Sequence, residues 1–272
     1  MSRTPGLALA ALMAPALWLS ACATSSVTQT GAISSYDRLQ AVKTTRTKAG
    51  IVADGPALAA ARSVRIQPVT YGADAGVGEG VSAAESALIA NLVGRTLCVK
   101  LSNRYDIVAY PAPADLTIRA VITRMTPTNR TAAAASLPLR AAGMVVGLPF
   151  PGRFPVGLGS FAAEGEAVDA RGAQRAAMVW ARGADMFTNR ARVSRIGDAY
   201  ALSNAFAGDF AALIITAKNP LHDIPPMPFG TRPRPVSLIC DAYGKANAAN
   251  GFVAGYVGAP PGWTEGKRPS TP

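Results

Sequence analysis

The chain has 272 residues, of which 49% are hydrophobic, with 27 lysines and arginines, 16 acidic residues, one histidine and three cysteines. This length fits one large domain or two small ones. A net charge of +11 often indicates nucleic-acid binding, but the sequence has no zinc-finger, homeodomain or RNP pattern, so we expect no nucleic-acid partner. The single histidine and the three cysteines do not have the spacing of metal ligands, and we expect no metal or cofactor.

The N-terminus has the three parts of an export signal. A short first part carries one cation, Arg3, and the apolar run 7–19 is too short to cross a bilayer of about 30 Å as a helix. The run leads into Leu19-Ser20-Ala21-Cys22, a cleavage site of small residues that ends in cysteine. An ordinary secretory signal needs no cysteine there, although one can occur by chance. We predict a signal peptide over 1–21.

The tetrapeptide that ends at Cys22 resembles the lipobox of bacterial lipoproteins. The resemblance implies that Cys22 is the lipid attachment residue, carries fatty acids such as palmitate, and becomes the first residue of the mature protein. Two or three acyl chains on one residue make a permanent anchor. Because Ala23 replaces the aspartate that retains such proteins in the inner membrane, the resemblance implies an outer-membrane anchor facing the periplasm.

Without residues 1–21 the chain has 251 residues and a net charge of about +10, since 26 cations face 16 acids. Most of these cations are arginines spread along the chain, and only Arg190, Arg192 and Arg195 cluster. In a cell envelope, anionic lipid headgroups or a cell-wall polymer are the partners that such a charge attracts. A solvated basic surface without a specific partner is the alternative.

The distribution of residue types divides the mature chain into three parts. The first, 22–55, is interpreted as a lipidated tether because it begins with small and polar residues. The middle part, 56–218, contains the periodic hydrophobic patterns of one folded domain. The last part, 219–272, is a proline-rich connector followed by a C-terminal tail rich in glycine and alanine.

Hydrophobic periodicity predicts the elements of the middle part. Ser82, with Glu85 three residues later, forms a capping box that begins a helix, and the helix ending near residue 216 has a continuous apolar face. Alternating stretches on either side of Arg171-Gly172 have the spacing of a hairpin. The expected strands are 62–69, 105–110, 114–125, 158–169 and 174–184, and the expected helices are 82–103 and 195–216. This pattern predicts a two-layer α+β fold, with a mostly antiparallel sheet of about five strands and two helices packed on one face.

Two cysteines other than Cys22 remain in the mature chain, Cys98 and Cys240. An even pair in an oxidising compartment favours a disulfide, and two buried thiols are the alternative. In its predicted helix, Cys98 lies with Arg95 on the side away from the main apolar stripe, where another segment could reach it.

Several segments carry a resemblance to a known family. They are the lipobox, Gly31-Ala32-Ile33-Ser34-Ser35-Tyr36-Asp37-Arg38-Leu39, the long helix ending near Arg104-Tyr105, Ala163-Glu164-Gly165-Glu166-Ala167-Val168-Asp169, and Gly197-Asp198-Ala199-Tyr200. Together they resemble the bacterial lipoprotein family known as domain of unknown function 3313, over about residues 20–217. The resemblance implies an envelope location and an α+β fold, and the family has no established activity to transfer.

Few residues could carry catalysis. The sequence has no G-x-S-x-G, H-E-x-x-H or P-loop motif, and its histidine, His222, lies in the proline-rich connector. Glu164 and Glu166 point to one face of a strand, where paired carboxylates could bind a cation or act as acid and base. We favour a structural interpretation, in which Arg175 lies opposite Glu166 as a cross-strand charge pair.

The segment 132–160 is apolar, rich in glycine and proline, and contains only Arg140 and Arg153 as charged residues. We expect a long loop over 132–157. Exposed apolar loops often mark interaction sites, so this one could contact a membrane, a partner or another copy, or could fold back over its own sheet. The candidate interaction residues are Leu139, Met144, Val145, Val146, Leu148, Phe150 and Phe154.

The sequence thus predicts a membrane-anchored envelope lipoprotein, with a non-catalytic binding or assembly module facing the periplasm. A subunit of an oligomeric envelope or secretion assembly, with the 132–160 segment as its contact, is the first alternative. A carboxylate-dependent enzyme using Glu164 and Glu166 is the second. We expect no enzymatic activity, and the sequence leaves the oligomeric state open.

Overall fold

The fold is known from a computed structural model that describes residues 27–76, 80–146, 153–221, 238–244, 258–263 and 265, with the backbone alone over 139–146. The strands are β1 (Gln40–Lys43), β2 (Thr47–Ala53), β3 (Ser63–Ile66), β4 (Thr70–Tyr71), β5 (Asp106–Val108), β6 (Leu116–Thr126), β7 (Ser160–Asp169) and β8 (Gln174–Gly183). The α-helices are α1 (Gly55–Ala60), α2 (Ala83–Leu101), α3 (Arg130–Val146) and α4 (Gly197–Thr216), and two 3₁₀ helices are η1 (Leu238–Tyr243) and η2 (Pro261–Trp263).

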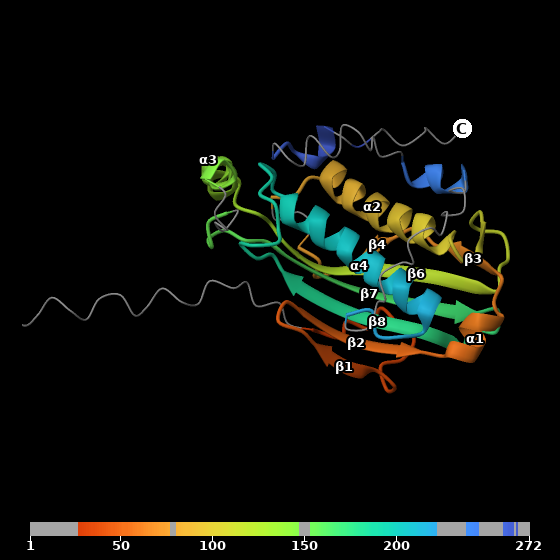
Figure 1. Ribbon diagram of the computed structural model, residues 1–272. Coiled ribbons are helices and arrows are strands. Elements are labelled where there is room, and N and C mark those ends of the chain that lie inside the picture. The colour runs from red at the N-terminus through yellow and green to blue at the C-terminus, as the bar shows by residue number, and fades with distance from the viewer. Residues whose placement is uncertain are drawn as a thin grey trace, which may run out of the picture.

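The strands form one sheet in the order β1-β2-β8-β7-β6-β3-β5, and β4 pairs with β6 off this path. The pairs from β1 to β6 along this order are antiparallel, whereas β3 is parallel to both β6 and β5. Helices α2 and α4 cover one face of the sheet, as Figure 1 shows. The predicted α+β class is confirmed, but the sheet has eight strands rather than about five.

The two strands at the start of the domain correct the predicted tether. The range 22–55 contains β1 and β2, and β2 pairs with β8 over seven residues, from Thr47 opposite Arg182 to Ala53 opposite Ala176. Their sequences, QAVK and TKAGIVA, are short and contain few large apolar residues. β1 is the edge strand, and β2 lies beside it, between β1 and β8. Strands at or near an edge need little apolar surface, so their local pattern is weak.

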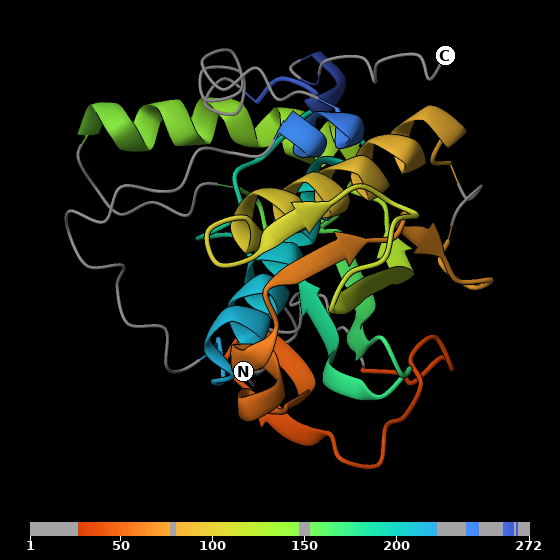
Figure 2. The ribbon, with the colours of Figure 1, turned by 90° about the vertical axis from the view of Figure 1, so that its right-hand side faces the viewer.

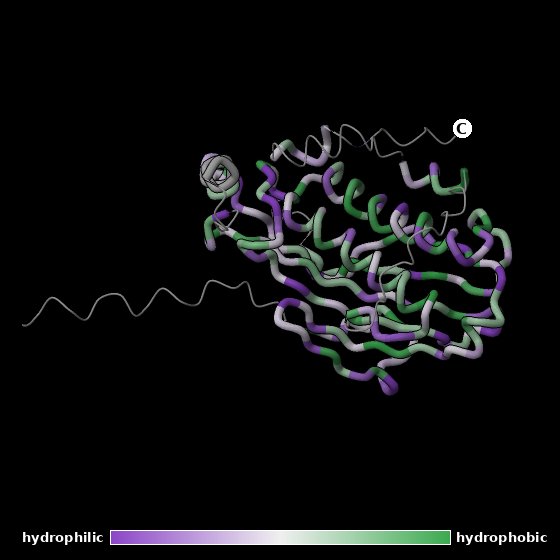
Figure 3. The backbone as a smooth tube through the Cα atoms, in the orientation of Figure 1, coloured by the Kyte–Doolittle hydropathy of each residue, from purple (hydrophilic) through white to green (hydrophobic). Residues whose placement is uncertain are grey.

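The core lies between the sheet and its two helices. Phe161 of β7 and Trp180 of β8 meet Phe206 and Phe210 of α4, with ring centroids 6.0 to 6.3 Å apart. Between these rings, a Cβ added to Gly165 would lie 2.6 Å from Phe210, so only glycine lets α4 approach β7 this closely. Figure 3 shows hydrophobic residues concentrated in the central strands and the two covering helices.

The predicted capping box of α2 is confirmed. The Ser82 hydroxyl accepts a hydrogen bond from the Glu85 N–H at 3.2 Å, and the Glu85 carboxylate accepts one from the Ser82 N–H at 3.0 Å. The side of α2 expected to be polar is nevertheless buried, because the C-terminal residues pack over it. There Arg95 makes a bidentate ion pair with Glu265, at 2.6 and 2.8 Å.

Helix α3 corrects the expected loop over 132–157. Residues Arg130–Val146 are helical, with Pro138 inside the helix, and Asn129 begins it by accepting the N–H of Ala132 at 3.0 Å. The run of four alanines favours a helix. The glycines and prolines that follow are typical of a loop, and they led to the wrong prediction. Figures 1 and 2 show α3 standing apart from the two-layer body.

One carboxylate of α4 makes stability depend on pH. Burial raises the pKa of Asp209 from 3.8 to about 6, although the carboxylate accepts a hydrogen bond from Trp180 Nε1 at 2.9 Å. The folded chain therefore holds this proton to a higher pH than the unfolded chain. The resulting stabilisation is full below about pH 4 and is lost as the pH rises to about 6.

We therefore expect Asp209→Asn to stabilise the protein relative to the parent as the pH rises. The free-energy difference should move by about 1–3 kcal/mol in favour of the variant between pH 4 and pH 7. Urea unfolding of both proteins at the two pH values measures this change. A difference that is the same at both pH values would contradict the raised pKa.

Candidate functional site

The face of the sheet opposite the helices carries the two glutamates of β7. Side chains alternate along a strand, and Gly165 faces Phe210 of α4, so Glu164 and Glu166 point to the opposite face. Their exposed fractions are only 0% and 1%. The cover is residues 30–36, which we call the N-terminal strap.

Among the described residues, every hydrogen-bond donor to Glu164 belongs to the strap. Both the N–H and the hydroxyl of Thr30 donate to Glu164 Oε1, at 2.8 and 3.0 Å, and the Tyr36 hydroxyl donates to Oε2. Among the ion pairs of the described residues, none involves Glu164. Burial, followed by the bond to Glu164, raises the pKa of the Tyr36 phenol, which stays protonated as a donor.

Glu166 joins the strap to the sheet itself. Its Oε2 accepts the Ser34 N–H at 2.9 Å and the Gln174 side-chain amide at 3.2 Å, and its Oε1 accepts from Arg119 at 3.3 Å. Arg119 lies directly opposite Glu166 on β6. The predicted partner Arg175 was therefore wrong.

Register explains the error over Arg175. Ala177, not Arg175, is opposite Glu166 on β8, because the turn pairs Val168 with Gln174 and an irregularity between Ala167 and Val168 adds one more residue to the shift. Arg175 instead binds Asp169 at 2.7 Å and Asp54 at 2.8 Å. Its guanidinium lowers the pKa of the Asp169 carboxyl below the ordinary value.

Apolar contacts reinforce the strap. Ile33 is buried against Ala177 and Val179 of β8. Three partly buried side chains pack around this small cluster, those of Tyr36, Leu39 and Val52. The strap thus closes a second, smaller core on the open face of the sheet.

The contacts of the two carboxylates define what they can do. Six hydrogen bonds, three to each, satisfy Glu164 and Glu166. A general acid or base needs room for a substrate within hydrogen-bond reach, and the strap fills that space. Nor does the described part of the chain contain a group of three or more acidic, cysteine or histidine residues placed to hold a metal. The geometry suits a fastening for the strap.

We expect Tyr36→Phe to loosen the strap. The variant loses the donor to Glu164 and the acceptor of the Gly31 N–H, which lies 2.8 Å from the Tyr36 oxygen. Removing one partner from a buried charged acceptor costs about 1–3 kcal/mol. Amide hydrogen exchange at Thr30 and Ser34 should therefore quicken by at least about tenfold.

Tyr110→Phe is the matched control, because Tyr110 is 51% exposed and follows β5, at the edge of the sheet opposite β1. It should leave exchange in the strap unchanged. Equal protection of the strap in both variants would show that Tyr36 does not fasten it.

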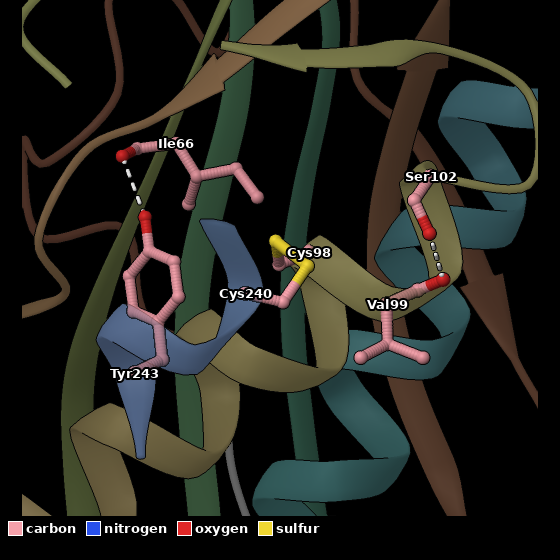
Figure 4. The surroundings of a disulfide bond; sticks show 6 residues. All are labelled: Ile66, Cys98, Val99, Ser102, Cys240 and Tyr243. Carbon is pink, nitrogen blue, oxygen red and sulfur yellow. Dashed lines mark hydrogen bonds between the residues drawn. A yellow bond between two sulfur atoms is a disulfide. The ribbon is translucent and has the colours of Figure 1, made fainter. Parts of the chain in front are cut away.

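The predicted disulfide between Cys98 and Cys240 is present, with the two Cα atoms 5.6 Å apart. Figure 4 shows it joining α2 to η1, where Tyr243 donates to the carbonyl of Ile66 at 2.9 Å. Tyr243 also lies over Gly94, where a Cβ would come within 2.5 Å of its ring. Helix η1 is thus fixed to the outer side of α2.

The other predicted site residues are not brought into one site. Cys22, His222, Leu148 and Phe150 lie outside the described residues. Leu139 and 144–146 belong to α3, whose backbone alone is described there. Phe154 follows the helix and is 41% exposed.

The strap residues are what sequence reasoning missed. The stretch from Gly31 to Leu39 carries part of the family resemblance, but its position in the range 22–55 predicts a tether. A usable signal was present in β7, since two glutamates within a small and apolar strand require buried hydrogen-bond donors. Their source, more than 120 residues away in the chain, has no local pattern.

The geometry therefore defines a two-layer α+β domain with a carboxylate-fastened N-terminal strap. The family described as "Protein of unknown function (DUF3313)" matches residues 28–210, from the strap into α4. The chain belongs to this family. A comparison with curated proteins gave no match.

Two similar solved structures are dodecamers from Paraburkholderia phytofirmans, one of a PelC variant and one of PelC. They are 11% and 12% identical to this chain and cover 63% and 66% of it, with 99% of their own chains matched. Their TM-scores are 0.37 and 0.34, too low to support an argument about function.

One helix of the described part, α4, has the length and mean hydropathy, 1.3, of a membrane span. Half of that stretch is buried within the protein, and α4 packs on β7 and β8. A core helix satisfies the same criteria, and the contacts of α4 are those of a core helix.

Proposed function

We propose that this protein is an envelope lipoprotein, anchored through acylated Cys22, whose domain is a non-catalytic binding or assembly module facing the periplasm. The observation that carries the proposal is the strap, whose bonds begin at Thr30, eight residues after Cys22. Eight extended residues span at most about 29 Å. The anchor would therefore hold the domain close to the bilayer, where a binding module could act.

We propose a non-catalytic role because of the burial and the hydrogen bonds of Glu164 and Glu166. Both are buried and bonded to the strap, so the paired carboxylates serve the fold. The buried pair would have to lose the strap before a substrate could reach it.

A subunit of an oligomeric envelope assembly is the second candidate. Helix α3 favours it, because part of this helix extends beyond the two-layer body (Figure 2). The mass of the detergent-extracted protein in analytical ultracentrifugation tests this role. A monomer at all concentrations would exclude it.

The anchor is tested by Cys22→Ser in cells. Because an uncleaved signal could itself hold the chain in a membrane, the variant is exported with an ordinary secretory signal in place of residues 1–21. We expect it to leave the membrane fraction and to take up no labelled palmitate, since no acyl chain remains to be buried. Ser26→Ala, in the native chain, is the control and should stay in the membrane. A Cys22→Ser protein that remains in the membrane after a salt wash would place the anchor elsewhere.

A further inference from the structure

One end of the sheet gathers features that the strap does not explain. Here β6 ends at Thr126 opposite Ser160, the first residue of β7, and Ser160 lies opposite Gly183, the last residue of β8. Helix α3 and the loop 184–196 both extend from this end, as the chain order requires. We call it the α3 end.

Large apolar side chains are exposed at the α3 end. Phe154 and Val156, between α3 and β7, are 41% and 55% exposed, and Phe187, in the loop after β8, is 69% exposed. Exposed aromatic and aliphatic side chains beside cations are typical of surfaces that rest in a bilayer interface.

A cavity of about 870 Å³ also opens at the α3 end, lined in part by Gly157 and Leu158, and its lining includes Arg130 and Arg195 but no acidic residue. Both arginines also line a neighbouring cavity of about 600 Å³, where the one acid is Glu85, already bonded to Ser82. Neither arginine is in an ion pair among the described residues. The two cavities, which we call the cleft, therefore carry a net positive charge, with two arginines against one glutamate.

The sequence around this cleft is also positively charged. Between Asp115 and Glu164 the chain contains five arginines and no acidic residue. Guanidinium groups bind phosphate groups through paired hydrogen bonds.

The strap directs the N-terminus to this end. Thr30 bonds to Glu164 and Ser34 bonds to Glu166, so the strap runs in the same direction as β7. Followed backwards, it approaches the start of β7, about 13 Å from Glu164 at 3.3 Å per residue. The proposed lipid on Cys22 would thus emerge at the α3 end.

We propose that the α3 end docks on the surface of an anionic phospholipid bilayer. Phe154, Val156 and Phe187 enter the headgroup region, and Arg130 and Arg195 bind lipid phosphates. This inference rests on the proposed anchor, which would hold the domain at a bilayer. It adds the orientation of the domain, in which the α3 end of the sheet faces the membrane and α3 lies along it.

The test uses the chain from Ala23 to Pro272, which keeps every described contact but has no acyl group. Flotation measures its binding to vesicles of phosphatidylglycerol or phosphatidylcholine. We expect binding to phosphatidylglycerol that weakens with salt, and little binding to phosphatidylcholine. The double change Arg130→Glu and Arg195→Glu should reduce binding by at least about tenfold, since each basic residue contributes appreciably at an anionic surface.

A matched pair of charge reversals separates this site from net charge. Arg171→Glu and Lys218→Glu change the charge equally but lie at the other end, in the β7–β8 turn and after α4. This control should bind within about twofold of the parent. Phe154→Ser with Phe187→Ser should weaken binding several-fold, and thermal melts verify that each variant is folded.

Three outcomes would overturn the inference: no binding to phosphatidylglycerol, equal losses in the site and control pairs, or binding of inorganic phosphate at Arg130 and Arg195 without vesicle binding. The last would make the cleft a site for free phosphate. Because the chain tested has no acyl group, these results are independent of whether Cys22 is lipidated in cells.

Discussion

Asp198→Ala should lower the free energy of unfolding by about 3–5 kcal/mol, because it leaves a buried arginine without its counter-charge. Asp198, in the first turn of α4, and Arg153 are each 1% exposed and form a bidentate ion pair. Asp198 also accepts the Gly159 N–H at 2.8 Å. The pair fixes the return of the chain from α3 to the start of β7.

Urea unfolding of the variant and parent measures this loss. Asp74→Ala is the control, since Asp74 is exposed, and it should change stability by less than about 0.5 kcal/mol. The double variant Arg153→Met with Asp198→Leu removes both charges and should recover part of the loss. If Asp198→Ala is as stable as Asp74→Ala, the pair is not buried as described.

Loss of the Cys98–Cys240 disulfide should cost about 2–5 kcal/mol. The bond joins residues 142 positions apart, and cross-linking so long a loop strongly restricts the unfolded chain. It also holds η1 against α2, where Cys98 is fully buried. We expect Cys98→Ala with Cys240→Ala to melt at a lower temperature than the parent.

Sensitivity to reductant provides the control for that variant. Dithiothreitol should lower the melting temperature of the parent and have no effect on the double alanine variant, because only the parent contains the bond. Two free thiols per chain in the denatured, unreduced parent would contradict the pairing.

The sequence predicted the parts of the fold that have strong local patterns. The capping box at Ser82 and the apolar face of α4 located the two helices, and the alternation in β6, β7 and β8 located the sheet centre. The predicted export to an oxidising compartment, together with the even number of remaining cysteines, also predicted the Cys98–Cys240 disulfide.

What the sequence could not predict depends on contacts between distant segments. β2 is stabilised by pairing with β8, more than 120 residues later, and its own pattern is weak. The partner of Glu166 is Arg119 because the long-range pairing of β6 with β7 sets the two residues opposite each other, whereas the β7–β8 register sets Ala177, not Arg175, opposite Glu166. The burial of Asp198 depends on Arg153, a partner 45 residues earlier in the chain that no local pattern identifies.

The central claim, a lipid anchor eight residues before the strap, is tested most directly by the N-terminal peptide of the mature protein. Trypsin should release Cys22–Arg38 from protein extracted from membranes, and mass spectrometry reads its modification. We predict a peptide that begins at Cys22 and carries the mass of a diacylglyceryl group and a further acyl chain. A mature chain that begins at another residue, or an unmodified Cys22, would contradict the account.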